Sequence, residues 1–147
     1  MGIVNAWFIG ARYSQKGPKG GWMARIVLAE DDEVLRRFLQ RGLEKAGHRV
    51  AIAADGLQAY AELHDTGADL LIADIVMPGL DGIELARRAC LERPDLRVIF
   101  ITGFAAVAVR AREFKAPVGV RVLSKPFHLR ELVGEAQRLL DARLPVA

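Results

Sequence analysis

Reactive side chains follow apolar runs at four places in this 147-residue chain. One run, Leu-Leu-Ile-Ala, leads directly into Asp74. An earlier run is followed by Glu30 and Asp31, a later run ends at Thr102, and the last is followed closely by Lys125. Carboxylates are the ligands that a hard divalent cation prefers, while an ammonium group and a hydroxyl group suit a phosphoryl group.

This set of side chains predicts that Asp74 accepts a phosphoryl group. Carboxylates serve as nucleophiles in covalent catalysis. Glu30 and Asp31 are expected to hold a metal ion, directly or through water, because three neighbouring carboxylates repel one another unless a cation is present. Mg²⁺ suits such a site better than zinc, since the chain has no Cys and His spacing typical of zinc. Lys125 and Thr102 would contact the phosphoryl group.

The elements that must position these residues alternate along the chain from Met23. Strands are expected at 25–29, 48–53, 70–74, 97–102 and 118–123, and helices at 33–46, 55–66, 83–92, 105–114 and 128–143. Strict alternation predicts an α/β fold with a parallel five-stranded sheet and helices on both faces. Because parallel strands end at the same edge of a sheet, the reactive side chains should meet there.

Two of these helices have apolar residues at helical spacing that are expected to face the sheet. In the first helix they are Leu35, Phe38, Leu39, Leu43 and Ala46. In the second helix they are Leu57, Tyr60 and Leu63.

The chain is expected to contain one domain, at residues 23–143, followed by a short tail at 144–147. Residues 1–22 are rich in glycine near their end and have no clear periodicity, so we expect a disordered extension or an artefact of an upstream start site or of cloning. Three of the 21 basic side chains lie in residues 1–22, which contain no acid, so residues 23–147 carry 18 of each sign. The domain is therefore neutral, and nucleic-acid binding is not expected.

Sequence signals for export or membrane insertion are absent. The first residues do not form a signal peptide, and no apolar run is long enough to span a bilayer. The single cysteine, Cys90, cannot form an internal disulfide and is compatible with a reducing compartment. We therefore expect a cytoplasmic protein with no membrane partner.

Five short motifs together resemble the receiver domain of bacterial two-component response regulators. They are Glu30-Asp31, Asp74, Met77-Pro78, Thr102 and Lys125-Pro126-Phe127. The resemblance implies a flavodoxin-like, doubly wound (βα)₅ fold with strand order 2-1-3-4-5 and Mg²⁺-dependent phosphorylation of Asp74. It also implies a metal ligand from the backbone carbonyl of Val76, a cis peptide bond before Pro126, and a phosphoacceptor signalling protein instead of an enzyme.

Longer stretches around Asp74, Thr102 and Lys125 resemble the CpdR-type single-domain response regulators. That resemblance implies phosphate input from a histidine kinase or a histidine phosphotransferase. It further implies that the unphosphorylated form acts as an adaptor that delivers cargo to the ClpXP protease. A stand-alone relay or motility-type receiver, without a protease role, stays open as the alternative. A phosphatase with an Asp nucleophile is disfavoured, because Val76 stands where such hydrolases have a second acid.

Three further residues are candidates for a switch or an interaction surface: Val122, Phe104 and Phe127. Val122 stands where most receivers have an aromatic residue that reports phosphorylation, or it simply fills a strand position. Val76 and Phe104 are expected to flank the path of an attacking water molecule, which predicts a long-lived phospho-Asp74. Phe104 can equally belong to the core or to a partner surface.

Overall fold

The computed structural model describes residues 23–116 and 119–142. The expected extension at 1–22 and the expected tail at 144–147 lie outside the described residues. Strands and helices alternate through the described part, in the order β1 (Arg25–Ala29), α2 (Glu33–Lys45), β2 (Arg49–Ala53), α3 (Gly56–Thr66), β3 (Leu70–Asp74), α4 (Gly82–Glu92), β4 (Arg97–Thr102), α5 (Ala105–Glu113), β5 (Val120–Ser124) and α6 (Leu129–Asp141).

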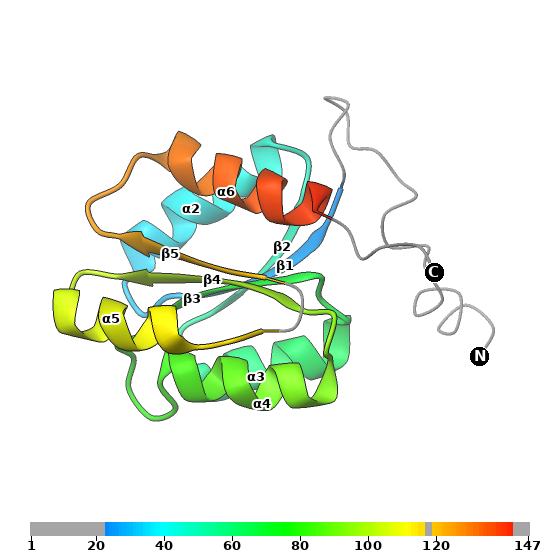
Figure 1. Ribbon diagram of the computed structural model, residues 1–147. Helices are drawn as coiled ribbons and strands as arrows, with labels where there is room; N and C mark the ends of the chain where they lie inside the picture. Colours follow the sequence, from blue (N-terminus) through cyan, green and yellow to red (C-terminus); the bar gives the residue numbers. More distant parts are fainter. Residues whose placement is uncertain (1–22, 117–118, 143–147) are drawn as a thin grey trace.

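The five strands form one sheet in the order β2-β1-β3-β4-β5, and every neighbouring pair is parallel. Helices α2 and α6 cover one face of this sheet, and α3, α4 and α5 cover the other (Figure 1). The predicted α/β fold and the flavodoxin-like strand order are confirmed. The peptide bond between Lys125 and Pro126 is cis, as the resemblance implied.

The core has two layers because both faces of the sheet are covered. Every residue of β3 and β4 is buried, as expected for central strands of a parallel sheet. Between the sheet and α2 and α6 lie Leu28, Leu39, Leu43, Leu132 and Leu140, and between the sheet and α3, α4 and α5 lie Val27, Leu63, Leu71, Leu85 and Phe100. The strand that ends in Asp74 is thus fixed from both sides.

Three of the loops at the carboxyl edge end in an aspartate that caps the following helix. The carboxylate of Asp32 accepts a hydrogen bond from the Leu35 N–H, that of Asp55 from Gln58, and that of Asp81 from Glu84. Such caps satisfy backbone donors that the first turn of a helix leaves unpaired. They therefore determine where the loops that follow β1, β2 and β3 end.

Two predicted helix faces are wrong in part. Leu57 is 64% exposed, because α3 begins at Gly56 and its buried stripe consists of Gly56, Ala59 and Leu63. Phe38 is 52% exposed, since the buried residues of α2 are Leu39 and Leu43. Each exposed residue is adjacent in the sequence to a residue of the buried stripe. At such positions, an apolar side chain does not by itself determine whether the residue faces the core or the solvent.

Small differences separate the predicted and observed ends of the later elements. β5 spans Val120–Ser124 and so includes one residue more than the predicted end, while the predicted first residue, Val118, lies outside the described residues. α6 begins at Leu129 because His128 is its N-cap. Among the described residues, no helix is long and apolar enough to cross a membrane.

Candidate functional site

The carboxyl edge of the sheet brings together residues from four strands. Glu30 directly follows β1, Asp74 is the last residue of β3, Thr102 is the last residue of β4, and Lys125 directly follows β5. The register pairs Asp74 with Ile101 and Thr102 with Ser124, so these strands end at nearly the same height. The fold therefore brings these residues together at one edge of the sheet, as predicted from the sequence.

Asp74 is nearly buried, with 6% of its surface exposed, and both of its carboxylate oxygens have partners. Oδ1 accepts a hydrogen bond of 3.1 Å from the backbone N–H of Val76, and Oδ2 accepts one of 2.8 Å from Lys125 Nζ. The backbone of Val76 therefore lies beside the Asp74 carboxylate. These contacts hold the carboxylate in one orientation at the end of its strand.

Lys125 joins two carboxylates that come from different strands. Its Nζ donates to Asp74 Oδ2 at 2.8 Å and to Glu30 Oε1 at 3.0 Å. Burial acts to lower the pKa of Lys125, but the hydrogen bonds and negative charges of Asp74 and Glu30 raise it above its usual value. Lys125 is therefore a fixed positive charge at this site.

Glu30 is fully buried, and its carboxylate is held from two directions. Oε2 accepts a hydrogen bond of 2.9 Å from the Asp32 N–H, while Oε1 contacts Lys125. Burial raises the pKa of Glu30 to about 6, against the lowering effect of the Asp32 N–H and of Lys125. The Asp74 carboxylate adds to the increase, so these acids oppose one another's ionisation, and a cation among them would favour the charged forms.

Glu30, Asp31 and Asp74 could together hold a metal ion. One carboxylate oxygen from each residue lies within 4.8 Å of the other two. Asp31 is exposed, whereas Glu30 and Asp74 are buried, so the cluster has one open side. Three oxygen donors with access to water match the preferences of Mg²⁺, which keeps part of its hydration shell in protein sites.

Asp32 follows this cluster in the sequence but has a different role. Its side chain caps α2 through the Leu35 N–H at 3.0 Å. Of the three consecutive acids, Glu30 and Asp31 therefore belong to the carboxylate cluster with Asp74. Asp32 caps α2 at the end of the loop.

Thr102 is buried at the end of β4, and its hydroxyl oxygen accepts a hydrogen bond of 3.1 Å from the Phe104 N–H. The backbone carbonyl of Thr102 accepts one of 2.8 Å from the Lys125 N–H. Val76 and Phe104, two apolar residues near this edge, are 45% and 60% exposed. Both side chains are thus accessible to solvent or to a partner.

The other two candidate switch residues lie on opposite faces of the sheet. Val122 is half-buried and packs against the core under α3, α4 and α5. Phe127 is half-buried and packs against the core under α2 and α6. They do not form one continuous surface, since the sheet separates them.

Two glycines that the sequence analysis did not single out shape the loop after Asp74. A Cβ atom on Gly82 would lie 2.4 Å from the Asp74 carbonyl oxygen, and one on Gly56 would lie 2.1 Å from the Leu80 carbonyl oxygen. Only glycine allows the backbone to approach this closely. Each glycine directly follows an aspartate that caps a helix, a sequence signal that could have identified both positions.

Comparisons with known proteins agree with this geometry. A family model described as the response regulator receiver domain matches residues 26–137. The chain is 55% identical over 120 residues to the response regulator receiver protein CpdR of Brucella abortus (strain 2308), and this match covers 82% of the chain and 99% of that protein.

Two further matches cover the same part of the chain. It is 36% identical to the DNA-binding transcriptional regulator NtrC of Azospirillum brasilense, over 84% of the chain but 26% of that protein. The crystal structure of a response regulator receiver protein from Sinorhizobium medicae WSM419 superposes with a TM-score of 0.74 at 28% identity and covers 83% of this chain and 98% of that one.

Proposed function

The chain belongs to the response regulator receiver domain family and is closely related to CpdR; on this basis we propose that it is a phosphoacceptor signalling protein phosphorylated on Asp74. The observation that carries this proposal is the position of Lys125 Nζ between Asp74 and Glu30, next to a third carboxylate from Asp31. A fixed cation beside a nearly buried nucleophile is what phosphoryl transfer requires, because the reaction depends mainly on positioning and neutralisation of charge.

In the proposed reaction, a histidine kinase or a histidine phosphotransferase presents a phosphohistidine to Asp74. One carboxylate oxygen of Asp74 forms the new bond to phosphorus while the bond between phosphorus and the histidine nitrogen breaks. The electron pair of that bond stays with the imidazole. Lys125 then pairs with the phosphoryl oxygens, and the Thr102 hydroxyl donates a hydrogen bond to them.

The metal ligands in this proposal are the carboxylates of Glu30, Asp31 and Asp74 and the backbone carbonyl of Val76. A bound Mg²⁺ would neutralise the negative charge that accumulates on the phosphoryl oxygens. The Val76 N–H already contacts Asp74, which supports a place for the Val76 carbonyl close to the cluster. No cofactor other than Mg²⁺ is proposed.

The output of the protein is proposed to be protein–protein contact instead of catalysis, in a domain that spans residues 23–143 and acts in the cytoplasm. The close relationship to CpdR supports an adaptor role, in which the unphosphorylated form delivers cargo to the ClpXP protease. The only catalysis proposed is its own phosphorylation and dephosphorylation.

A capture experiment tests the adaptor role. Immobilised wild-type chain and the Asp74→Ala variant would be incubated with purified ClpX, with and without prior phosphorylation. Both unphosphorylated forms are expected to retain ClpX, and phosphorylation is expected to release it from the wild type only. Asp55→Asn is a matched control, because Asp55 lies at the same edge and asparagine also caps helices well. If neither form retains ClpX, the adaptor role is wrong and a relay or motility-type receiver is favoured.

A further inference from the structure

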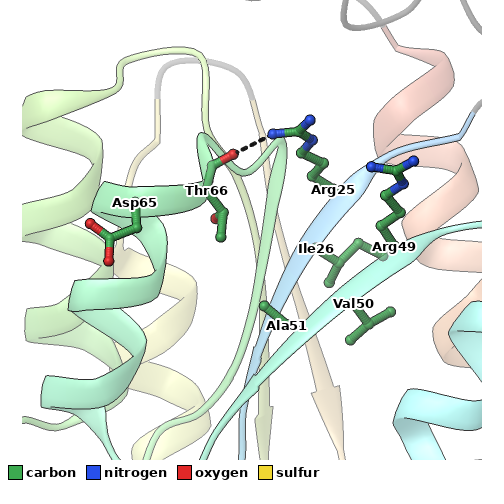
Figure 2. A pocket seen from close by; sticks show the side chains of 7 residues that line it. All are labelled: Arg25, Ile26, Arg49, Val50, Ala51, Asp65 and Thr66. Atoms are coloured by element: carbon green, nitrogen blue, oxygen red, sulfur yellow. Dashed lines mark hydrogen bonds between the residues drawn. The ribbon is translucent and has the colours of Figure 1, made fainter. Parts of the chain in front are cut away.

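A pocket lies at the edge of the sheet opposite to Asp74, and we propose that it binds a small organic phosphate of the size of a nucleoside monophosphate. The pocket has a volume of about 410 Å³ and is lined by Arg25 and Arg49, by three apolar residues and by the end of α3 (Figure 2). This volume lies within the range of small-molecule sites, about 300–1,000 Å³.

The position of the two arginines follows from the sheet. Arg25 is the first residue of β1, Arg49 is the first residue of β2, and the parallel register places them opposite each other. Side chains alternate between the faces of a sheet, so both arginines lie on the face that Ala51 shares and that α3 covers. Glu30 and the acidic cluster lie beyond the other end of β1, so the two sites are separate.

A pair of like charges directly opposite each other on neighbouring strands is unfavourable. Burial lowers the pKa of Arg25 and the charge of Arg49 lowers it further, while Asp69 partly offsets both effects. In the part of the chain that the structure describes, the guanidinium group of Arg49 has no ion-pair or hydrogen-bond partner. A bound anion between the two groups would offset their repulsion.

Arg25 is already held in place for this role. Its Nη1 donates a hydrogen bond of 2.9 Å to the Thr66 carbonyl oxygen at the end of α3. Figure 2 shows the side chains of Arg25 and Arg49 extending from neighbouring strands at this end of the sheet, with the Arg25 guanidinium group directed at the Thr66 carbonyl oxygen and the carboxylate of Asp65 pointing away from both. Planar guanidinium groups recognise phosphate through paired hydrogen bonds.

The size of the pocket favours a ligand with a body larger than an inorganic anion. Ala51 lines the pocket on the face of the two arginines, whereas the side chains of Ile26 and Val50 pack into the core under α2 and α6. An inorganic anion alone would leave most of the volume of about 410 Å³ unfilled. Residues 1–22 precede β1 and contain basic residues but no acid, so their charge does not complement the two arginines. These features together favour a phosphorylated nucleoside as the occupant.

The test is a titration of the full-length, ¹⁵N-labelled chain with AMP and with GMP, followed by NMR at constant ionic strength. We expect the amide signals of Ile26, Val50 and Thr66 to shift to saturation with at least one nucleotide. The affinity for that nucleotide should exceed the affinities for inorganic phosphate and for the free nucleoside by about tenfold or more. Arg49→Gln is expected to weaken binding by about tenfold or more. Arg41→Gln, an exposed change on α2, should bind as the wild type does.

Three results would overturn the proposal. The first is the absence of saturation with both nucleotides, which includes the case in which residues 1–22 fill the pocket. The second is equal affinity for inorganic phosphate and for the nucleotides. The third is unchanged nucleotide affinity in Arg49→Gln. Because Arg49 is exposed, this variant is expected to fold, and the amide spectrum itself reports whether it does.

Discussion

Lys125 Nζ and Asp74 Oδ2 lie 2.8 Å apart, although the two residues are 51 positions apart in the sequence. The contact exists because β3 and β5 lie on either side of β4 and run parallel, so that their carboxyl ends reach the same edge. The same ammonium group contacts Glu30 at 3.0 Å. Lys125 therefore neutralises part of the negative charge of Glu30 and Asp74, whose carboxylates would otherwise repel each other.

Removal of this ammonium group is expected to slow phosphorylation. Lys125→Gln keeps most of the side-chain length but removes the charge that would pair with the phosphoryl oxygens. We predict that the rate of Asp74 phosphorylation falls on the order of 100-fold, the size of effect seen when one preorganised donor is removed from a reaction site. Initial rates with acetyl phosphate and Mg²⁺, measured by intact-protein mass spectrometry, check this. Lys115→Gln, a change at an exposed lysine, is the control and should react at the wild-type rate; a normal rate in Lys125→Gln would contradict the role of Lys125.

A tyrosine at position 122 tests how the phosphorylated state is read. Val122 is half-buried against the core under α3, α4 and α5, away from the Asp74 carboxylate, so Val122→Tyr should leave the rate of phosphorylation unchanged. We expect it to change partner binding, because a larger side chain must displace its neighbours in the core or turn outward. The dissociation constant for the binding partner, in both phosphorylation states, is the measurement. Val122→Ile serves as the control, and unchanged binding of Val122→Tyr in both states would exclude a switch at this position.

The lifetime of phospho-Asp74 is predicted to depend on Phe104. Its side chain is 60% exposed and carries no group that could orient a water molecule. Phe104→Glu places a carboxylate near the phosphoryl group, where it can position an attacking water, so phosphate loss should become several times faster. Phe104→Leu stays apolar and should keep the slow rate. The decay is followed by mass spectrometry after the phosphate donor is removed, and rapid loss of equal rate in wild type and Phe104→Glu would be inconsistent with this account.

Protonation of the buried His48 side chain is expected to destabilise the fold in mild acid. Its side chain is buried, and Nδ1 accepts a hydrogen bond of 3.1 Å from the Ala24 N–H. Burial lowers the pKa of His48 from 6.5, so the unfolded chain binds this proton more readily than the folded chain does. The contribution of His48 to the free energy of unfolding should therefore be fully present above pH 6.5 and should decrease as the pH falls from there toward the lower pKa of the folded state. Glu30, whose pKa is raised to about 6, acts in the opposite direction.

Urea unfolding at several pH values, with two variants, isolates this effect. His48→Asn keeps a hydrogen-bond acceptor but does not titrate, so the change in its free energy of unfolding from pH 7 to pH 5 should lack the decrease that His48 contributes to the wild type. His64→Asn changes a side chain that is 74% exposed and should keep the wild-type slope. If His48→Asn and the wild type have equal slopes, His48 is not the group responsible.

Much of the fold could be predicted because its signals are local and strong. The run Leu70–Asp74 is apolar up to one carboxylate, and the structure buries the whole strand. Regular alternation of strands and helices then determines the parallel sheet, and with it the convergence of Glu30, Asp74 and Lys125. The order of the strands came from the family resemblance, since alternation alone is compatible with other orders.

Other features depend on contacts that no local pattern specifies. Leu57 and Phe38 are apolar but exposed, because the rotation of each helix is set by how its whole stripe packs on the sheet. The close approach of Gly82 to the Asp74 carbonyl oxygen is a property of the folded loop. The pairing of Arg25 with Arg49 required the register of β1 and β2, since the two residues lie far apart in the sequence.

The most direct test of the central claim is the location of the phosphoryl group. The full chain would be incubated with acetyl phosphate, with Mg²⁺ or with excess chelator, and the product would be analysed by mass spectrometry after reduction with borohydride, which converts a phosphoaspartate to homoserine. We predict Mg²⁺-dependent modification at Asp74 alone, its complete loss in Asp74→Asn, and an unchanged level in Asp55→Asn. Modification that persists in Asp74→Asn, or that does not require Mg²⁺, would contradict the account.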